Sequence, residues 1–394
     1  MLKSLINSSF FYFLLPAYLA VILLLTFFYI PQDFYFGIVA YYLIITLPIL
    51  LLTLLFPFKM ALQDYYASII KQPRYKYIIF LTCIIITLCG PLDIYINGFK
   101  LLHPETYAIF KGVGRYIRHI TILCWIFIPV AFIFVSNRFI KVFLCSYALL
   151  FPILIIDRNR LFLGGYTFFL CYILSYLCAK KNKLSTKLTF ICIPIIICAV
   201  FSSLGFFRSG NMLIIPSSSQ NLIPEAYPLS DALSNLVPSL QQVILYVTSP
   251  IFNFSTVVAS NFLNPEVLQS QFSPFSRETL NAYLYTPIFV PRFNVGTEFY
   301  PFLLYGGLPL VVPAYLFLLA GFMLSSFLLK RYPNIFTFLI FIKISYSALF
   351  MNFAPQYYIL LNFLFCILML VLWSIAATLN WAVTTHRKEI IYEA

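Results

Sequence analysis

Residues 34–57 read FYFGIVAYYLIITLPILLLTLLFP, a run without a charged side chain. As an α-helix rising about 1.5 Å per residue, this run is long enough to cross the roughly 30 Å hydrocarbon core of a bilayer. The run is continuously apolar, whereas a strand of a transmembrane β-barrel alternates apolar and polar residues over about ten positions. The stretch therefore predicts a membrane-spanning helix.

The whole chain resembles this stretch in composition. It is 62% hydrophobic and 9% charged, whereas an ordinary soluble domain carries about 25% charged residues. The sequence therefore predicts an all-α, polytopic transmembrane bundle in which residues 1–394 form a single integral membrane domain. We expect ten spans, near residues 9–30, 34–57, 77–95, 119–135, 142–156, 161–178, 188–206, 302–329, 335–353 and 357–381.

The charges of the connecting segments predict the orientation. If the N-terminus is cytoplasmic, the cytoplasmic segments carry fifteen cations and three acids, and the opposite segments carry nine of each. An excess of Lys and Arg on the cytoplasmic side is what the positive-inside rule requires. We therefore expect both termini inside, in a bacterial inner membrane. The basic residues are scattered over short loops that face lipid, which argues against a nucleic-acid partner.

Residues 207–301 form the one long connection, which lies between the seventh and eighth expected spans and should be a large periplasmic loop. Within it, residues 240–263 are half apolar. We interpret this stretch as an amphipathic helix on the membrane surface. The alternative is that it crosses the bilayer, which would place the later basic loops on the outer side and is opposed by the charge distribution.

The sequence predicts no metal or cofactor. All nine cysteines fall within apolar runs, the chain has three histidines, and no CxxC or HExxH motif is present. Buried cysteines of this kind behave as small hydrophobic residues, and a transition-metal site would need clustered ligands.

Arginines at the predicted outer face are the first candidates for ligand binding, because a guanidinium holds phosphate oxygens in a bidentate manner and never loses its charge. Arg158 and Arg160 lie in a very short turn, and Arg208 directly follows the seventh expected span. The alternative is that these arginines reach lipid headgroups or that the pair in the turn binds Asp157.

The end of the large loop carries a second group of polar residues. Asn294, Thr297 and Glu298 stand just before the eighth expected span, and the cations Arg277 and Arg292 precede them. An amide, a hydroxyl and a carboxylate at the water–membrane boundary are suited to positioning a sugar. For the two arginines the alternative is a solvated surface charge.

A general base needs a carboxylate within hydrogen-bond reach of the attacking hydroxyl. Glu298, Asp157 and Asp93 are the candidates, although Glu298 could instead pair with Arg292, and Asp93 with Lys100. Lys343 lies inside an expected span, either as a partner in an internal ion pair or as a contact for a lipid-linked headgroup.

Taken in order, these features resemble the oligosaccharide repeat-unit polymerases of the O-antigen polymerase (Wzy) type. The resemblance covers nearly the whole chain and depends on the order of motifs that are individually weak. They are the arginine-bearing turn DRNRLFLGG (157–165), the large loop, the stretch YVTSPIFN (246–253), and the segment NVGT (294–297) followed by Gly306-Gly307.

The resemblance implies a metal-independent, GT-C-like glycosyltransferase that joins undecaprenyl-diphosphate-linked oligosaccharides into a surface polysaccharide, with a chain-length regulator as a possible partner. It further implies that Arg158, Arg160 and Arg208 hold the diphosphate with help from Arg292, and that Glu298 or Asp157 activates the acceptor hydroxyl.

The chain departs from one pattern of that family. Some relatives carry arginines followed by glycine eleven positions later (Arg-x10-Gly), and no arginine here is followed by glycine at that distance. Two alternative functions stay open. An O-antigen ligase typically uses a histidine in its large loop, and residues 207–301 contain none. A flippase or transporter for lipid-linked sugars usually has short loops and more charges within its spans.

Overall fold

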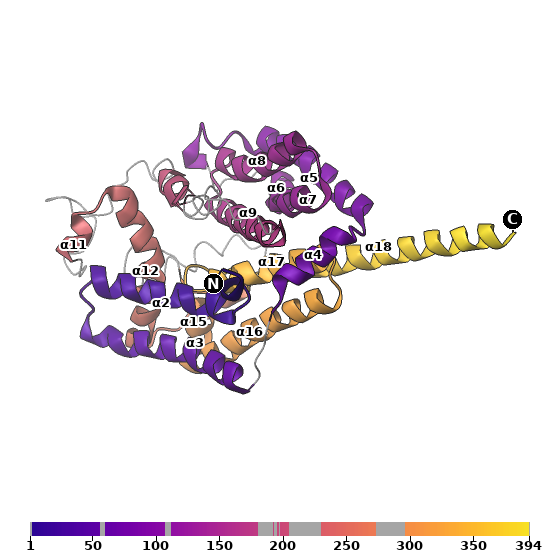
Figure 1. Cartoon of the computed structure of the whole chain (residues 1–394). Coiled ribbons are helices and arrows are strands. Elements are labelled where there is room, and N and C mark those ends of the chain that lie inside the picture. The colour runs from indigo at the N-terminus through magenta and orange to yellow at the C-terminus, as the bar shows by residue number, and fades with distance from the viewer. Residues whose placement is uncertain are drawn as a thin grey trace. The chain divides into compact units, whose positions relative to one another are not determined.

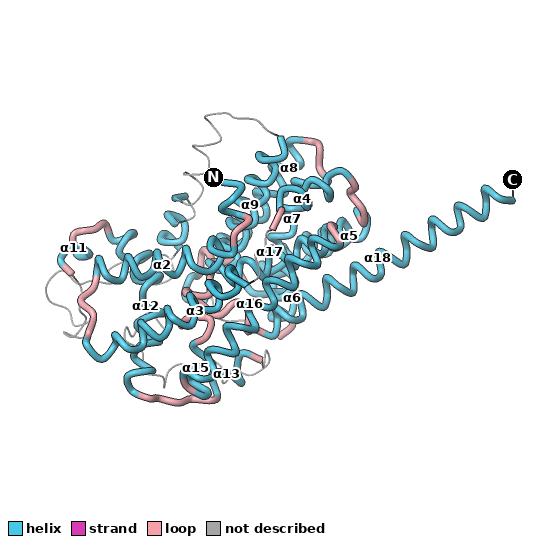
Figure 2. Tube along the Cα trace, turned by 60° about the horizontal axis from the view of Figure 1, so that its bottom comes forward, coloured by secondary structure: helices cyan, strands magenta, loops and turns pink. Residues whose placement is uncertain are grey.

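The computed structural model describes residues 2–55, 60–106, 112–179, 192, 195–196, 198–204, 230–272 and 296–393. The elements of secondary structure in this part of the chain are α-helices and short 3₁₀-helices (Figure 2). Eight of the described helices are long and apolar enough to cross a membrane. The predicted all-α, polytopic architecture is therefore confirmed. The eight spans are Ser9–Phe27, Gln32–Leu55, Lys76–Asn97, Gly114–Phe134, Arg158–Ala179, Ser239–Ser260, Leu308–Arg331 and Leu360–Asn380.

The set of spans differs from the expected one in four respects, of which the additional span Ser239–Ser260 is described below with α12. Helices α8 (Arg138–Leu154) and α17 (Ile335–Leu349) form where spans are expected, but they have 17 and 15 residues. The expected span at 188–206 is described only in part, at residues 192, 195–196 and 198–204. The expected span at 302–329 is divided into α15 (Tyr300–Gly306) and α16 (Leu308–Arg331). The division falls at Gly307, whose φ of +71° is a conformation that glycine adopts without strain.

The chain folds as two compact units. Unit 1 comprises Met1–Ala61, Asn211–Ser326 and Lys343–Leu364, and unit 2 comprises Leu62–Gly210, Phe327–Ile342 and Phe365–Ala394. Three helices, α16, α17 and α18 (Leu360–Glu393), each contribute residues to both units.

Unit 1 is built around aromatic contacts between α2 (Ser9–Phe27), α3 (Tyr35–Leu55) and α16. The ring of Phe13 packs edge-on against Tyr315 and Phe322. The Tyr315 hydroxyl donates to the carbonyl of Ile45 at 2.9 Å, which gives a buried polar group its partner. The smaller elements of this unit are α1 (Leu2–Ile6), η1 (Gln32–Phe34), α11 (Asp231–Ser234) and α13 (Glu266–Gln271).

Helix α12 (Pro238–Ser260) occupies the stretch that we interpreted as a surface helix, and the structure differs from that expectation. Figure 1 shows α12 crossing α2 and α3. It does so near the α2–α3 turn, where the Phe252 ring contacts Phe28 and Phe34. In addition, 61% of the residues in its most apolar 18-residue stretch are buried. The helix is therefore part of the core of unit 1. It is also one of the eight helices long and apolar enough to cross a membrane, which is the alternative that the sequence left open.

Unit 2 contains the helices between residues 62 and 179. Amphipathic α4 packs against the last turns of α9, where the Tyr66 and Ser175 hydroxyls lie 2.9 Å apart and Gln63 donates to the carbonyl of Leu177 at 3.0 Å. Because α4 contacts the last turns of α9, the first turn of α9 lies at the end of unit 2 away from α4. The elements are α4 (Leu62–Lys71), α5 (Lys76–Asn97), η2 (Pro104–Thr106), α6 (Gly114–Thr121), η3 (Ile122–Ile126), α7 (Phe127–Phe134), α8 and α9 (Arg158–Ala179).

Candidate functional site

The turn between α8 and α9 places the first candidate residues. Ile156 adopts a φ of +52°, which is unusual for a β-branched residue, and the backbone N–H of Asp157 donates to the carbonyl of Pro152 at 2.8 Å. The Asp157 carboxylate then accepts a hydrogen bond from the N–H of Arg160 at 3.2 Å. Asp157 thus caps the N-terminus of α9, and this hydrogen bond fixes the backbone position from which the Arg160 side chain extends.

Arg160 is the centre of a buried polar cluster. Its side chain is 3% exposed, and its Nε lies 2.8 Å from Oδ2 of Asp157. Its two terminal nitrogens donate to the Thr121 hydroxyl at 2.9 Å and to the Arg118 carbonyl at 2.7 Å. Every nitrogen of this guanidinium therefore has an acceptor close by, as a buried cation requires.

The cluster continues onto α5. The Thr121 hydroxyl donates to Oδ2 of Asp93 at 2.7 Å, and Asn97 donates to Oδ1 of the same carboxylate at 2.6 Å. Asn97 also donates to the carbonyl of Gly114 at 3.0 Å. We call Asp93, Arg118, Thr121, Asp157 and Arg160 the Arg160 network. It joins the last turns of α5, the last turn of α6 and the start of α9 at one end of unit 2.

This end of unit 2 has more cations than acids. Its described residues include the cations Lys100, Arg115, Arg118, Arg158 and Arg160 and the acids Asp93, Glu105 and Asp157. Arg160 is enclosed, but Arg118 keeps 11% and Asp157 keeps 21% of the side chain exposed. Arg158 is half-buried, with its guanidinium carbon 4.8 Å from the centre of the Phe201 ring. The positive charge that an anionic ligand would meet is therefore carried by Arg118 and Arg158.

Some of the predicted roles can be compared with these positions. Asp157, Arg158 and Arg160 are close together, as the sequence suggests. The alternative that Arg160 pairs with Asp157 is also observed, so this arginine holds other side chains in place. The suggested pair of Asp93 with Lys100 is not found among the described contacts, because Asp93 binds Thr121 and Asn97, and the Lys100 ammonium donates to the carbonyl of Thr106 at 2.8 Å. Arg208 lies outside the described residues.

The sequence analysis missed Arg118 and Thr121 as members of the site. Arg118 is 3.5 Å from Asp157 although 39 positions separate them in the chain. In the sequence, these two residues are marked only as hydrogen-bonding residues three positions apart at the start of an apolar run. That pattern is common in membrane spans and does not indicate a site.

The second candidate region surrounds Glu298 in unit 1. Its carboxylate accepts hydrogen bonds from three consecutive backbone N–H groups of the loop between α17 and α18, those of Gln356 at 2.6 Å, Tyr357 at 3.0 Å and Tyr358 at 2.9 Å. The N–H of Glu298 itself donates to the carbonyl of Met351 at 2.6 Å. We call this arrangement the Glu298 cradle. It ties the start of α15 to the loop between α17 and α18.

The cradle is closed to solvent. Glu298 and Thr297 are fully buried. Burial raises the pKa of the Glu298 carboxyl to about 7, while the three backbone N–H groups and the Lys343 ammonium act in the opposite direction. The two roles suggested for Lys343, a partner in an internal ion pair or a contact for a lipid-linked headgroup, stay predictions.

Tyr41 and Asn352 are buried side chains near the cradle that bind each other. The Tyr41 hydroxyl donates to the side-chain oxygen of Asn352 at 2.6 Å, and it also lies beside Thr297. With its oxygens occupied by backbone donors, Glu298 is placed to hold the loop rather than to reach a substrate. Arg277, Arg292 and Asn294 lie outside the described residues.

The hydroxyl groups of the stretch at 246–253 bind within α12. Thr248 donates to the carbonyl of Ile244 at 2.8 Å, and Ser249 donates to that of Leu245 at 2.5 Å. Inside apolar helices, Ser and Thr hydroxyls commonly donate to the carbonyl one turn earlier. These two hydroxyls are therefore not directed to a ligand. Among the described residues, no group of His, Cys, Asp and Glu is arranged to hold a metal ion.

Comparisons with known proteins give no match: no family model, no curated protein and no solved structure is similar to this chain.

Proposed function

We propose that this chain is an inner-membrane glycosyltransferase that joins undecaprenyl-diphosphate-linked oligosaccharide repeat units into a surface polysaccharide. The proposal depends on one observation above all, the cationic end of unit 2. There, a buried Arg160 pairs with Asp157 and donates to the Thr121 hydroxyl and the backbone of Arg118, and Arg158 lies in the same first turn of α9.

The chemistry of the transfer explains why this arrangement is suitable. The bond between the anomeric carbon and the diphosphate breaks, the acceptor hydroxyl oxygen forms the new glycosidic bond, and the hydroxyl proton passes to a base. Negative charge therefore develops on the departing lipid diphosphate. Fixed guanidinium groups at the level of the headgroups stabilise that charge without reorganising during the reaction. Arg118 and Arg158 are in the position to do so.

Of the two carboxylates suggested as the base, Asp157 fits better. Its side chain is 21% exposed beside the arginines, whereas Glu298 is fully buried and accepts three backbone hydrogen bonds. A base must come within hydrogen-bond reach of the acceptor hydroxyl. We therefore assign proton acceptance to Asp157 and a supporting role to Glu298.

Complementation of a deletion strain tests the proposal. A polymerase mutant displays surface glycan with a single repeat unit, a flippase mutant displays none, and a ligase mutant accumulates polymer on the lipid carrier. We expect the first pattern, restored to long chains by the wild-type gene and not by Arg158→Ala. The matched control is Arg138→Ala, which removes an exposed arginine from the start of α8 and should restore long chains.

Two outcomes would contradict the proposal. Either of the other glycan patterns in the deletion strain would assign a different activity. Wild-type chain length from both Arg158→Ala and Arg118→Ala would remove the cationic end of unit 2 from the mechanism. Immunoblots of the membrane fraction establish that each variant is present in equal amount.

A further inference from the structure

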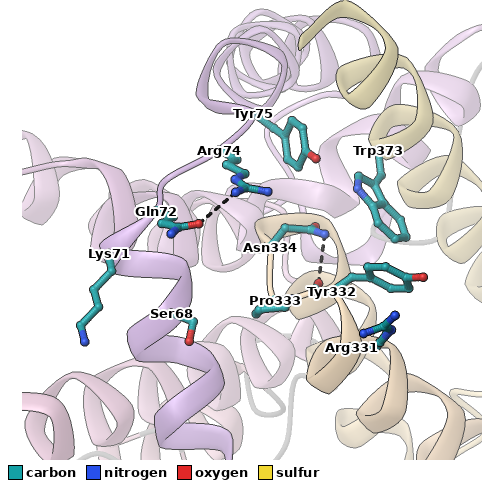
Figure 3. A pocket seen from close by; sticks show the side chains of 10 residues that line it. All are labelled: Ser68, Lys71, Gln72, Arg74, Tyr75, Arg331, Tyr332, Pro333, Asn334 and Trp373. Carbon is teal, nitrogen blue, oxygen red and sulfur yellow. Dashed lines mark hydrogen bonds between the residues drawn. The ribbon is translucent and has the colours of Figure 1, made fainter. Parts of the chain in front are cut away.

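A separate cavity of about 420 Å³ opens in unit 2 beside Tyr75 at the start of α5, whereas Asp93 of the Arg160 network lies near the end of that helix (Figure 3). It lies between the last turn of α4, the start of α5, the last turn of α16 and the middle of α18. Its size is within the range of small-molecule sites. The six residues that matter here are Lys71, Arg74, Tyr75, Arg331, Tyr332 and Trp373.

The cavity is positively charged. Three cations line it, Lys71, Arg74 and Arg331, and no acidic residue does. All three are exposed. Within the described part of the chain, none of them forms a salt bridge, and Arg74 donates to the side-chain oxygen of Gln72 at 3.0 Å. The helix dipole explains why cations stand at the C-terminal ends of α4 and α16. It does not explain why these cations line the same cavity. The converging charge favours an anionic ligand.

Aromatic side chains form a wall of the same cavity. The rings of Tyr332 and Trp373 lie 5.3 Å apart, and the Arg331 guanidinium carbon is 5.6 Å from the centre of the Tyr332 ring. Tyr and Trp are typical of the headgroup level of a membrane. Tyr75 lines the cavity with a φ of +68°, a strained conformation for a tyrosine and of a kind that often accompanies ligand sites.

An apolar track leads from the cavity along α16. Phe327 and Leu324 precede Arg331 by four and seven positions, so the three side chains share one face of the helix. Phe327 is 56% and Leu324 is 58% exposed. A ligand with a phosphate in the cavity would therefore have a place for a hydrocarbon chain on the adjoining helix surface.

We propose that this cavity binds the phosphate headgroup of an anionic glycerophospholipid, with an acyl chain along Phe327 and Leu324. The site lies at the end of unit 2 opposite the Arg160 network, and therefore in the other leaflet, which is the cytoplasmic one under the predicted orientation. It is independent of the proposed polymerase activity. The recognised chemistry is a phosphate ester, which a soluble compound could also supply.

Native mass spectrometry of the full chain in detergent micelles tests this site. The micelles contain equal amounts of phosphatidylglycerol and phosphatidylcholine with identical acyl chains, so the two lipids differ only in the headgroup. We expect selective retention of phosphatidylglycerol. Since a cation near a membrane surface contributes about 1 kcal/mol to binding an anionic lipid, Arg331→Ala and Arg74→Ala should each reduce retention about fivefold.

The matched control is Lys330→Ala. Lys330 is next to Arg331 in α16 and carries the same charge, but it does not line the cavity. It should retain the lipid as the wild type does. Equal losses from Lys330→Ala and Arg331→Ala would overturn the proposal, because they would indicate attraction to surface charge alone. Equal retention of the two lipids by the wild type would also overturn it.

A competition arm distinguishes a lipid from a soluble phosphate ester. Glycerol 1-phosphate carries the phosphate without the acyl chains and should not displace phosphatidylglycerol at matched concentration. Displacement at that concentration would show that the site binds soluble phosphate esters, and the lipid assignment would be wrong.

Discussion

At the scale of single residues, Arg160 shows why arginine and lysine are not equivalent in this chain. Its guanidinium reaches three acceptors on two segments, the Asp157 carboxylate before α9 and the Thr121 hydroxyl and Arg118 carbonyl of α6. A lysine ammonium is a single point and cannot reproduce that fork. The geometry therefore assigns Arg160 to positioning, and the proposed function gives ligand contact to Arg158 and Arg118.

Replacement of Arg160 should destabilise the protein. We expect Arg160→Ala to lower the free energy of unfolding by roughly 3–5 kcal/mol, because it leaves the charge of Asp157 without its closest partner in a largely buried site. Arg160→Lys should rescue only part of that loss. Thermal unfolding in detergent measures the effect, with the exposed Arg138→Ala as the control. An Arg160→Ala protein as stable as that control would show that the network contributes little.

Glu298 should make stability depend on pH. Its pKa is about 7 in the folded chain against an ordinary value of 4.5, so folding favours the protonated form. The stabilising contribution is complete below pH 4.5 and is lost as the pH rises through about 7. The difference corresponds to a decline on the order of 3 kcal/mol. Glu298→Gln, which cannot ionise, should lack this decline.

The measurement is the unfolding midpoint of each purified protein across that pH range. The matched control is Glu266→Gln, because Glu266 is exposed in the same unit and its replacement should leave the wild-type slope unchanged. A slope in Glu298→Gln as steep as that of the wild type would assign the pH dependence to other groups.

These two sites differ in how far the sequence predicted them. The pair of Asp157 with Arg160 is three positions apart at a helix start, so a local pattern reveals it. Arg118 could not be found in that way, since its contact depends on two helices meeting. The partners of Glu298 were also hidden, because they are backbone N–H groups and any residue type supplies those.

At the scale of elements, α12 packs closely on α3. A Cβ atom added at Gly37 would lie 2.8 Å from the backbone Cα of Ser255. We therefore expect Gly37→Val to force the two helices apart, at a cost of about 1–3 kcal/mol in the free energy of unfolding. Val39→Ala, at a position that is 53% exposed on the same helix, is the control and should have little effect. Equal unfolding midpoints for the two variants would contradict the packing of α12 on α3.

The sequence predicted the long apolar helices well, because a continuous apolar run has few other ways to satisfy its backbone in a membrane. It was less successful with α12, where Thr248, Ser249 and Asn253 suggest a face directed to water. The structure buries all three. Hydroxyl groups that bind carbonyls of their own helix no longer need water, and this compensation is invisible in a pattern of polar and apolar letters.

At the scale of the whole molecule, orientation is the prediction on which the proposed function depends. Asn159 follows Asp157 at the start of α9, Lys71 ends α4 at the opposite end of unit 2, and both are exposed. In a Cys192→Ser background, which removes the one exposed cysteine among the described residues, we expect an impermeant maleimide to label Asn159→Cys on intact cells. Lys71→Cys should be labelled only after permeabilisation. The reverse result would place the Arg160 network in the cytoplasm and exclude the periplasmic reaction.

The Glu298 cradle has a consequence for how the chain is made. The ribosome synthesises Glu298 before the three residues whose backbone N–H groups bind it, which follow 58 to 60 positions later. During that interval α15, α16 and α17 must enter the membrane while the acid still lacks those donors. A nascent chain that stops short of the loop before α18 therefore leaves this carboxyl without the three donors that bind it in the complete fold.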